Sequence, residues 1–325
     1  MRRREFIAVG SAALWALAAS AQQRLRVVGL LNASPEGGVA TAVREGLAEQ
    51  GYFQGRDYNF EYGGTPRYGP DQQDRIAADA ADLVRRGVTL IVVYRVLDAL
   101  IAKAATTSIP IVFSVGGDPV ATGIVDSLSR PGGNLTGNAN LNTDLIGKRL
   151  EILHELVPTA SSVGFIVNPT NAVYAQVETE HLQTAARALG VRILIKNVES
   201  STELDFAFAG LAHDGAGSVV VGGDALFYNL RDQLKVLTAR YALPSIYATR
   251  AWATAGGLVS YGTDYSEGYR LIGNYAARIL KGEKPSGLPV QLITKIDLII
   301  NLSTVKVLGI TVPPALLARA NEIIE

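Results

Sequence analysis

The feature that most constrains this chain is an alternation of short apolar runs with amphipathic segments, which occurs twice along the sequence. The apolar runs lie at 26–31, 89–94 and 109–113 in the first half and at 162–167, 218–221 and 243–247 in the second. The segments between them, such as 71–86, carry apolar residues at helical spacing. Buried strands that alternate with helices form parallel α/β sheets. Because the repeat is far longer than the about 20–50 residues of solenoid repeats, we predict two copies of a Rossmann-like α/β lobe.

The residues after the second copy indicate how the two lobes are joined. We expect a long helix over 265–280, a strand over 296–300, and a terminal helix that Pro313 and Pro314 open. These elements predict that the chain crosses between the lobes more than once, which makes a multi-strand hinge. The predicted domains are 22–139 with 264–285 for the N-terminal lobe and 140–263 with 286–325 for the C-terminal lobe.

The first 21 residues have the pattern of a secretory signal peptide. Three arginines at 2–4 precede an apolar run at 7–19, and Ala19 and Ala21 form a small-x-small cleavage site. A basic start of this kind serves either the general secretory route or the twin-arginine route. Removal of residues 1–21 would take three of the 30 basic and one of the 30 acidic residues, leaving a net charge of 27 − 29 = −2. We therefore expect a soluble periplasmic protein, and export argues against ATP-dependent or nicotinamide-dependent chemistry.

Composition and motifs narrow the function further. The chain has 0 Cys, which excludes disulfides, thiolate metal sites and a cysteine nucleophile, and its 3 His argue against a histidine-rich metal site. The balanced charge argues against nucleic-acid binding. No phosphate loop, dinucleotide-binding glycine motif, nucleophile elbow or zinc-protease motif occurs in the sequence. The sequence thus predicts neither a cofactor, a metal nor a catalytic residue, and it favours a binding protein over an enzyme.

Candidate ligand-binding residues follow from a rule of open parallel sheets, which bind ligands beyond the carboxyl ends of their strands. The loops expected at these ends carry amide, carboxylate, guanidinium and aromatic groups without a general acid–base pair, as a binding cleft does. The candidates are Asn32, Ser34, Tyr94, Arg95, Gly117, Asp118, Asn140, Asn168, Tyr174, Asp224, Phe227, Tyr247 and Trp252.

The charged candidates have competing interpretations. Arg95, or backbone amides near Ser34, would hold a ligand carboxylate, and Arg95 could equally point to solvent. Asp118 and Asp224 each close a Gly-Gly-Asp triplet, at 116–118 and 222–224, and either would accept a hydrogen bond from a ligand amine. The alternative is local, because an Asp in this position stabilises a turn or caps a helix.

The aromatic candidates would stack on an apolar or aromatic part of the ligand. They are Tyr94, Phe227, Tyr247 and Trp252. Trp252 is the one Trp outside the predicted signal peptide, and packing at the hinge is an equal alternative for it.

Several segments carry a resemblance to a known family. They read IPIVF at 109–113 followed by DPV at 118–120, RPGGNLTG at 130–137, GGLVSYG at 256–262, RILKGEKP at 278–285 and NLSTVKVLG at 301–309. Over essentially the whole mature chain, the sequence resembles ABC transporter substrate-binding proteins of the TrpX type. The resemblance implies a type I periplasmic-binding-protein fold with two lobes, three crossovers and a cleft that closes on a small ligand. It also implies delivery of an aromatic amino acid or related carboxylate to a membrane permease and its separate ATPase.

One departure from the family bears on the ligand. Related chains place small and hydroxyl residues after the second strand, where this chain has Tyr94 and Arg95. These side chains would crowd the spot where backbone amides could otherwise meet an anion. Three other functions stay open: a ligand-sensing module for a signalling receptor, a secreted enzyme, and a transcription regulator of the same fold. The expected signal peptide and the lack of a basic helix-turn-helix segment disfavour the regulator.

Overall fold

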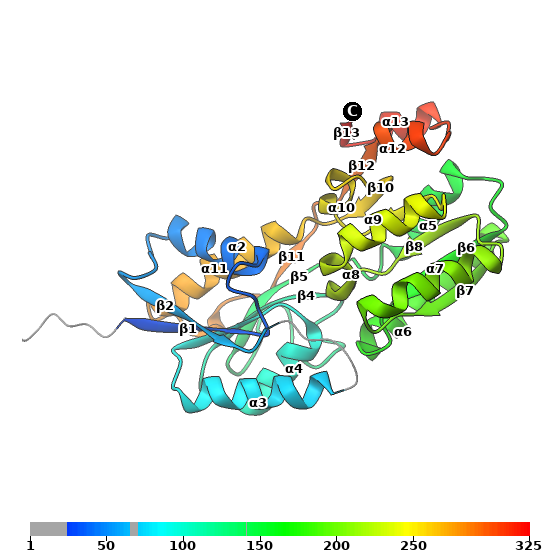
Figure 1. Ribbon diagram of the computed structural model, residues 1–325. Coiled ribbons are helices and arrows are strands. Elements are labelled where there is room, and N and C mark those ends of the chain that lie inside the picture. The colour runs from blue at the N-terminus through cyan, green and yellow to red at the C-terminus, as the bar shows by residue number, and fades with distance from the viewer. Residues whose placement is uncertain (1–24, 66–70, 141) are drawn as a thin grey trace, which may run out of the picture.

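The computed structural model describes residues 25–65, 71–140 and 142–325, which form two α/β lobes (Figure 1). The expected signal peptide, residues 1–21, lies outside the described residues. Among the described helices, none is long and apolar enough to span a bilayer. The predicted class of two α/β lobes with largely parallel sheets is confirmed.

The first lobe is built on a six-stranded sheet whose order is β11-β5-β4-β3-β1-β2. Its strands are β1 Arg26–Leu31, β2 Tyr58–Gly63, β3 Leu90–Val93, β4 Ile111–Gly116, β5 Leu135–Asn140 and β11 Gln291–Ile293, and every pairing is parallel. Alternate residues of a strand enter opposite cores, as strand geometry requires. In β1, Val28 and Leu30 pack toward α2 (Gly38–Glu49) and α11 (Tyr265–Leu280), whereas Leu31 packs toward α3 (Gln72–Arg85) and α4 (Val96–Ala105).

The second lobe is built on a seven-stranded sheet whose order is β13-β12-β10-β9-β8-β6-β7. Its strands are β6 Ser162–Val167, β7 Arg192–Asn197, β8 Ser218–Val221, β9 Ser245–Tyr247, β10 Val259–Gly262, β12 Asp297–Asn301 and β13 Glu322–Ile324. The β10–β12 pair is antiparallel and the other pairs are parallel. The helices of this lobe are α5 Ile146–Leu156, α6 Ala172–Leu189, α7 Leu204–His213, α8 Ala225–Asn229, α9 Arg231–Arg240, α10 Arg250–Thr254, α12 Leu302–Val307 and α13 Pro314–Arg319, with short 3-10 turns at Ser201–Glu203 here and at Pro285–Gly287 in the first lobe.

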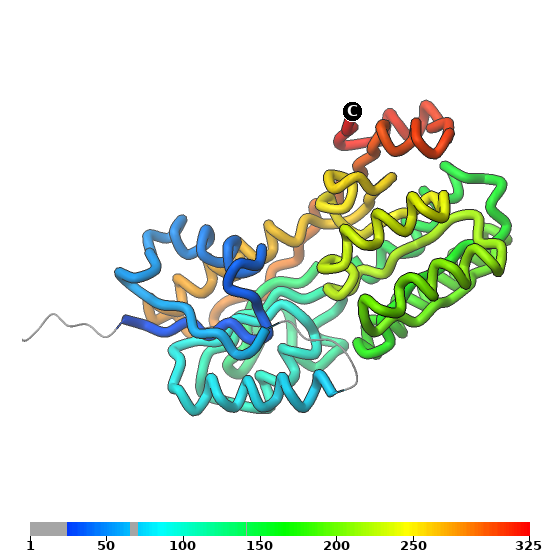
Figure 2. Tube along the Cα trace, in the orientation of Figure 1, coloured from blue at the N-terminus to red at the C-terminus, as the bar shows by residue number. Residues whose placement is uncertain are grey.

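The chain passes between the sheets three times: between β5 and α5, between β10 and α11, and between β11 and β12 (Figure 2). The fully buried Arg149 of α5 joins the first two passages. Its Nε donates to the Tyr261 carbonyl at 2.8 Å and its Nη2 donates to the Asn142 carbonyl at 2.8 Å. The Asn142 side chain in turn accepts from the Thr263 backbone N–H at 3.0 Å. These bonds hold the passages together as a hinge.

Two elements differ from the sequence-based expectation. Residues 286–325 were expected in the C-terminal lobe, but β11 pairs with β5, so the chain stays with the first sheet through Ile293. The sequence from 225 to about 242 predicts one continuous helix, but the structure divides it at Leu230 into α8 and α9. The short β11 has only three residues, too few for a periodic pattern to reveal its partner.

Helix α11 follows a strand of the second sheet but packs on the first lobe against α2, as expected for 264–285 (Figure 1). The two helices touch backbone to backbone. A Cβ added to Gly46 would lie 1.9 Å from the Arg270 carbonyl oxygen, and one added to Gly273 would lie 2.3 Å from the Val43 carbonyl oxygen. Glycine at both positions therefore permits the close approach that places the start of α11 between the lobes.

Candidate functional site

Two adjoining cavities lie between the lobes. The first, which we call the Arg95 cavity, has a volume of about 40 Å³, and the second, which we call the Asp264 cavity, has about 130 Å³. The Arg95 cavity is lined by Tyr94, Arg95, Val96, Ser114, Gly116, Asn140, Asn171, Tyr174, Gly223, Asp224, Ala225, Tyr265 and Tyr269. The Asp264 cavity is lined by Ser34, Gly37, Gly38, Val39, Tyr94, Ala225, Tyr228, Asn229, Thr249, Ala251, Asp264, Tyr265, Ser266 and Tyr269. Four residues are common to both, so the cavities share a wall.

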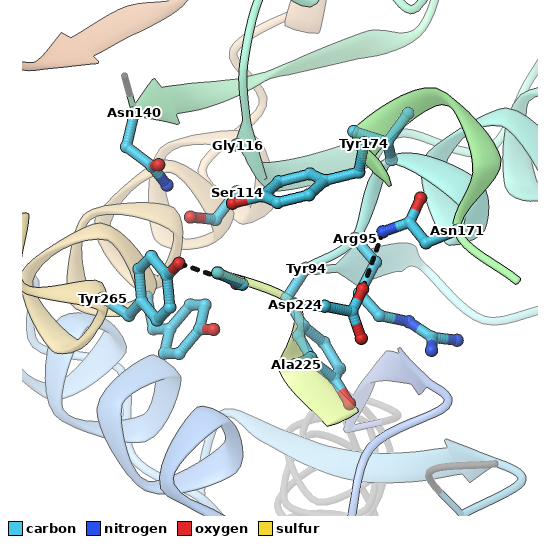
Figure 3. A pocket seen from close by; sticks show the side chains of 13 residues that line it. Tyr94, Arg95, Ser114, Gly116, Asn140, Asn171, Tyr174, Asp224, Ala225 and Tyr265 are labelled. Atoms are coloured by element: carbon cyan, nitrogen blue, oxygen red, sulfur yellow. Dashed lines mark hydrogen bonds between the residues drawn. The ribbon is translucent and has the colours of Figure 1, made fainter. Parts of the chain in front are cut away.

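The lining of the Arg95 cavity comes from strand ends of both lobes (Figure 3). Arg95 follows β3, Asn140 ends β5, and Asp224 follows β8. Tyr174 lies in the first turn of α6, after β6, and Tyr265 begins α11 at the second passage between lobes. This is the position that the carboxyl-end rule predicts for a ligand site.

Arg95 does not point to solvent, which was one of the two roles considered for it, and is buried beside the cavity. Its Nε and Nη2 donate to the two carboxylate oxygens of Asp98, at 2.9 and 2.7 Å, in a bidentate pair. Asp98 is fully buried, which raises the pKa of its carboxyl, and the adjacent guanidinium opposes that rise. The Nε–Nη2 edge of Arg95 is therefore engaged within the protein.

Asp224 and Asp118 follow the local alternative. Asp224 is the N-cap of α8 and accepts from the Leu226 N–H at 2.8 Å, from Asn168 at 3.0 Å and from Asn171 at 2.8 Å. Asp118 is exposed and accepts from the backbone N–H groups that follow it, at residues 120 and 121, at 2.7 and 3.2 Å. Asp224 lines the Arg95 cavity with its hydrogen bonds largely satisfied, whereas Asp118 lines neither cavity.

Three of the aromatic candidates belong to the core of the second lobe. Phe227 is fully buried there. Tyr247 and Trp252 stack on each other with ring centroids 4.4 Å apart and an interplanar angle of 10°. All three lie outside the linings of both inter-lobe cavities, which does not support their expected stacking on a ligand. Trp252 instead packs in the core of the second lobe.

Tyr174 forms a direct contact between the lobes. A Cβ added to Gly116 of the first lobe would lie 2.7 Å from the Tyr174 ring, and one added to Gly223 of the second would lie 2.6 Å from its hydroxyl. The Tyr174 hydroxyl is buried without a hydrogen-bond partner among the described residues, and burial raises its pKa well above the usual value. Glycine at both positions therefore leaves room for this side chain, whose ring lies beside Gly116 in Figure 3.

The loop after β8 is held by a hydrogen bond to a buried acidic side chain, Glu178. The Glu178 carboxylate accepts from the Gly223 N–H at 3.0 Å and lies 3.7 Å from Arg149 Nη1. Burial raises the pKa of Glu178 to about 8, against the opposing effect of Arg149. Tyr265 donates to the Gly223 carbonyl at 3.0 Å from the other side. The hinge, the loop and α11 are thus connected through one glycine.

The structure brings together about half of the predicted site residues. Tyr94, Arg95, Asn140, Tyr174 and Asp224 line the Arg95 cavity, and Ser34 lines the Asp264 cavity. Asn32, Gly117, Asp118, Asn168, Phe227, Tyr247 and Trp252 line neither. Of these, Asn32 lies just beneath the site, where its carbonyl accepts from the Tyr94 hydroxyl at 2.8 Å.

Sequence reasoning missed Tyr265 and Tyr269, which line both cavities. The helix that carries them was predicted with its observed bounds, but its first turn was not recognised as part of the site. A signal was present: the two tyrosines are four residues apart and so lie on one face of the helix. That face begins directly at a passage between the lobes. No group of three or more metal-binding side chains occurs in the described part of the chain.

Comparison with known proteins decides the family. A model of the ABC transporter substrate binding protein family matches residues 37–324. The chain belongs to this family. The substrate-binding protein is thus of a solute-binding kind rather than an enzymatic one.

Relatives and solved structures agree with this assignment. A tyrosine-binding protein from Clostridioides difficile is 28% identical over 267 residues, which cover 81% of this chain and 74% of that protein. A conserved domain protein from Vibrio cholerae has a TM-score of 0.80 at 27% identity, covering 92% and 99% of the two chains. An ABC domain from Streptococcus pneumoniae in complex with L-Trp has a TM-score of 0.79 at 22% identity, covering 92% and 100%. The fold is therefore the two-lobed type I periplasmic-binding-protein fold.

Proposed function

We propose that this substrate-binding protein captures an aromatic amino acid, or a related carboxylate, between its lobes and delivers it to the permease of an ABC importer. The observation that carries the proposal is the pair of cavities enclosed jointly by both lobes, with tyrosine side chains forming the wall between them. Aromatic walls with a few polar groups suit an aromatic ligand. The names of two similar proteins, one tyrosine-binding and one in complex with L-Trp, support the same ligand class.

With Arg95 engaged by Asp98, the backbone near Ser34 is the remaining candidate for the ligand carboxylate. Helix α2 starts beside Ser34, and its N-cap, Gly37, offers no side-chain cap. Thr249 also lines the Asp264 cavity. Its hydroxyl is buried without a hydrogen-bond partner among the described residues. Both features supply donors that an anionic group would satisfy.

We also propose for this protein the location and the partners that its sequence predicts. The protein would work in the periplasm after removal of residues 1–21, and it would meet the membrane through the permease, whose separate ATPase drives import. It would open and close about the three passages between its lobes, as two-lobed binding proteins do.

A thermal-shift screen tests the ligand class. The purified protein, unfolded and refolded to remove any carried ligand, is heated with L-Tyr, L-Trp, L-Phe, aromatic acids without an amine, nucleosides and sugars. A ligand at about 100 times its Kd adds about 2.7 kcal/mol to the free energy of unfolding. We expect a melting-temperature rise of several degrees with an aromatic amino acid. A rise with nucleosides or sugars alone would contradict the proposal.

A further inference from the structure

The Asp264 cavity is lined by a carboxylate, that of Asp264, whose hydrogen bonds among the described residues all go to one of its two oxygens. Asp264 lies in the passage between β10 and α11 and caps that helix, its Oδ1 accepting from the Ser266 N–H at 2.9 Å and the Ser266 hydroxyl at 2.7 Å. Within the described residues, no hydrogen bond is made to Oδ2. By contrast, the Asp224 carboxylate accepts three hydrogen bonds on its two oxygens. Asp264 is therefore the better placed acid for a new partner.

Three tyrosine rings form an inclined wall of the same cavity. The centroids of Tyr94 and Tyr269 are 5.9 Å apart with planes at 81°, and those of Tyr265 and Tyr269 are 6.3 Å apart with planes at 40°. The hydroxyls of Tyr94 and Tyr265 donate to the backbone carbonyls of residues 32 and 223, which holds both rings in place. Tyrosine faces attract cations, and several inclined rings beside an acid are a common way to hold an ammonium group.

The charges around the cavity also favour a cation. Among the described residues that line it, none is a Lys or an Arg. Arg250 interacts electrostatically with Asp264, but its Nε and Nη2 donate to the two carboxylate oxygens of Glu322, each at 2.7 Å. Arg231 lies over the Tyr228 ring, 5.3 Å from its centroid, so that ring is already partnered. The half-buried Asp264 carboxylate is thus the dominant charge that a ligand would meet there.

We propose that the Asp264 cavity holds the ammonium group of the ligand, between the Asp264 carboxylate and the rings of Tyr94, Tyr265 and Tyr269. The inference rests on the proposed function and narrows its ligand class to aromatic compounds that carry an amine. The ligand amine would then bind to Asp264, the residue that caps α11 at a passage between the lobes. A ligand bound there contacts the hinge directly, which connects binding to the arrangement of the lobes.

Calorimetric titration with three matched probes tests the proposal. They are L-tyrosine, tyramine, which lacks the carboxylate, and 3-(4-hydroxyphenyl)propanoate, which lacks the amine. The variant is Asp264→Asn, because Asn has the same shape and caps a helix as well as Asp does. We expect wild-type protein to bind both amines, and D264N to bind each at least about tenfold more weakly, with no change for the propanoate. The matched control is Asp118→Asn, at an exposed turn outside the linings of both cavities, which should alter no affinity.

A second variant, Tyr269→Leu, guards against a purely local effect at residue 264 and should weaken tyramine binding in the same direction. Equal affinity of D264N and wild-type protein for the amines would overturn the inference, as would a propanoate that binds as tightly as L-tyrosine. If the propanoate binds and the amines do not, the proposed function survives and this inference fails. If tyramine binds through Asp264 while L-tyrosine and the propanoate do not, the inference survives and the proposed aromatic amino acid is wrong. If none of the three binds, this inference is overturned, and the proposed function is decided by the thermal-shift screen with L-Trp and L-Phe.

Discussion

At the residue scale, the site depends on where side chains are absent as much as on where they are present. Tyr174 reaches from the second lobe to the first because Gly116 and Gly223 leave room for its ring and hydroxyl. Neither glycine has a left-handed backbone, so the requirement there is space and not conformation. A larger residue at either position would press against this buried side chain.

Gly116→Ala tests this contact. The added methyl would lie 2.7 Å from the Tyr174 ring, and we expect it to hold the lobes apart and to weaken binding of the aromatic amino acid about tenfold. Calorimetric titration measures the affinity. The control is Gly287→Ala, where an added Cβ would have no neighbour within 4 Å, and affinity should be unchanged. Unchanged binding by G116A would mean that the ring can turn aside.

The residue scale also shows how local chemistry limits what a sequence motif can do. The two Gly-Gly-Asp triplets looked alike, and both acids turned out to accept hydrogen bonds from the backbone that follows them. That role was one of two predicted interpretations, because Asp in these positions satisfies nearby N–H groups. The pairing of Arg95 with Asp98 was not predicted, although the two are three residues apart at the start of α4.

At the element scale, α11 decides the shape of the site. It leaves the second sheet, crosses to the first lobe and packs on α2, and its first turn supplies Tyr265 and Tyr269 to both cavities. The close contact of Gly46 and Gly273 sets the distance between α2 and α11. Both helices border the Asp264 cavity, so their spacing determines its width.

Gly46→Ala should destabilise the protein by about 1–3 kcal/mol, because its methyl would collide with the backbone of α11. Urea unfolding followed by circular dichroism measures the change. Gly38→Ala, in the same helix but with open space around the added Cβ, is the matched control and should be neutral or slightly stabilising. If the two variants unfold at the same urea concentration, the close packing of α2 on α11 is not required for stability.

At the scale of the whole molecule, described residues of the two lobes also meet directly outside the three passages. Gln72, buried at the start of α3, donates to the Thr170 carbonyl of the second lobe at 3.3 Å. Tyr174 meets Gly116 across the same boundary. In the proposed opening of the lobes, contacts of this kind must break, so we expect them to influence how long a ligand stays bound.

Gln72→Ala should speed ligand release. The loss of one hydrogen bond of about 0.5–1.5 kcal/mol corresponds to a roughly 2–10-fold faster dissociation, with little change in melting temperature of the ligand-free protein. Stopped-flow fluorescence with the bound aromatic amino acid measures the rate. The neighbouring Gln73 is exposed, and Gln73→Ala should leave the rate unchanged. A rate equal to wild type in Q72A would remove this bond from the closing contacts.

The amino-acid sequence by itself determined the duplicated α/β lobes, the strands at the six apolar runs and the helix α11 at 265–280. These follow from periodicity along neighbouring residues, which is a local property. Only the tertiary structure decided that β11 joins the first sheet, that Arg95 binds Asp98 and that Trp252 packs in a core. The tertiary structure alone also showed that Tyr265, Tyr269 and Asp264 line the Asp264 cavity. The physical reason is that the lining of a site between lobes depends on which strand ends and helix starts meet across the hinge, and long-range pairing sets those meetings.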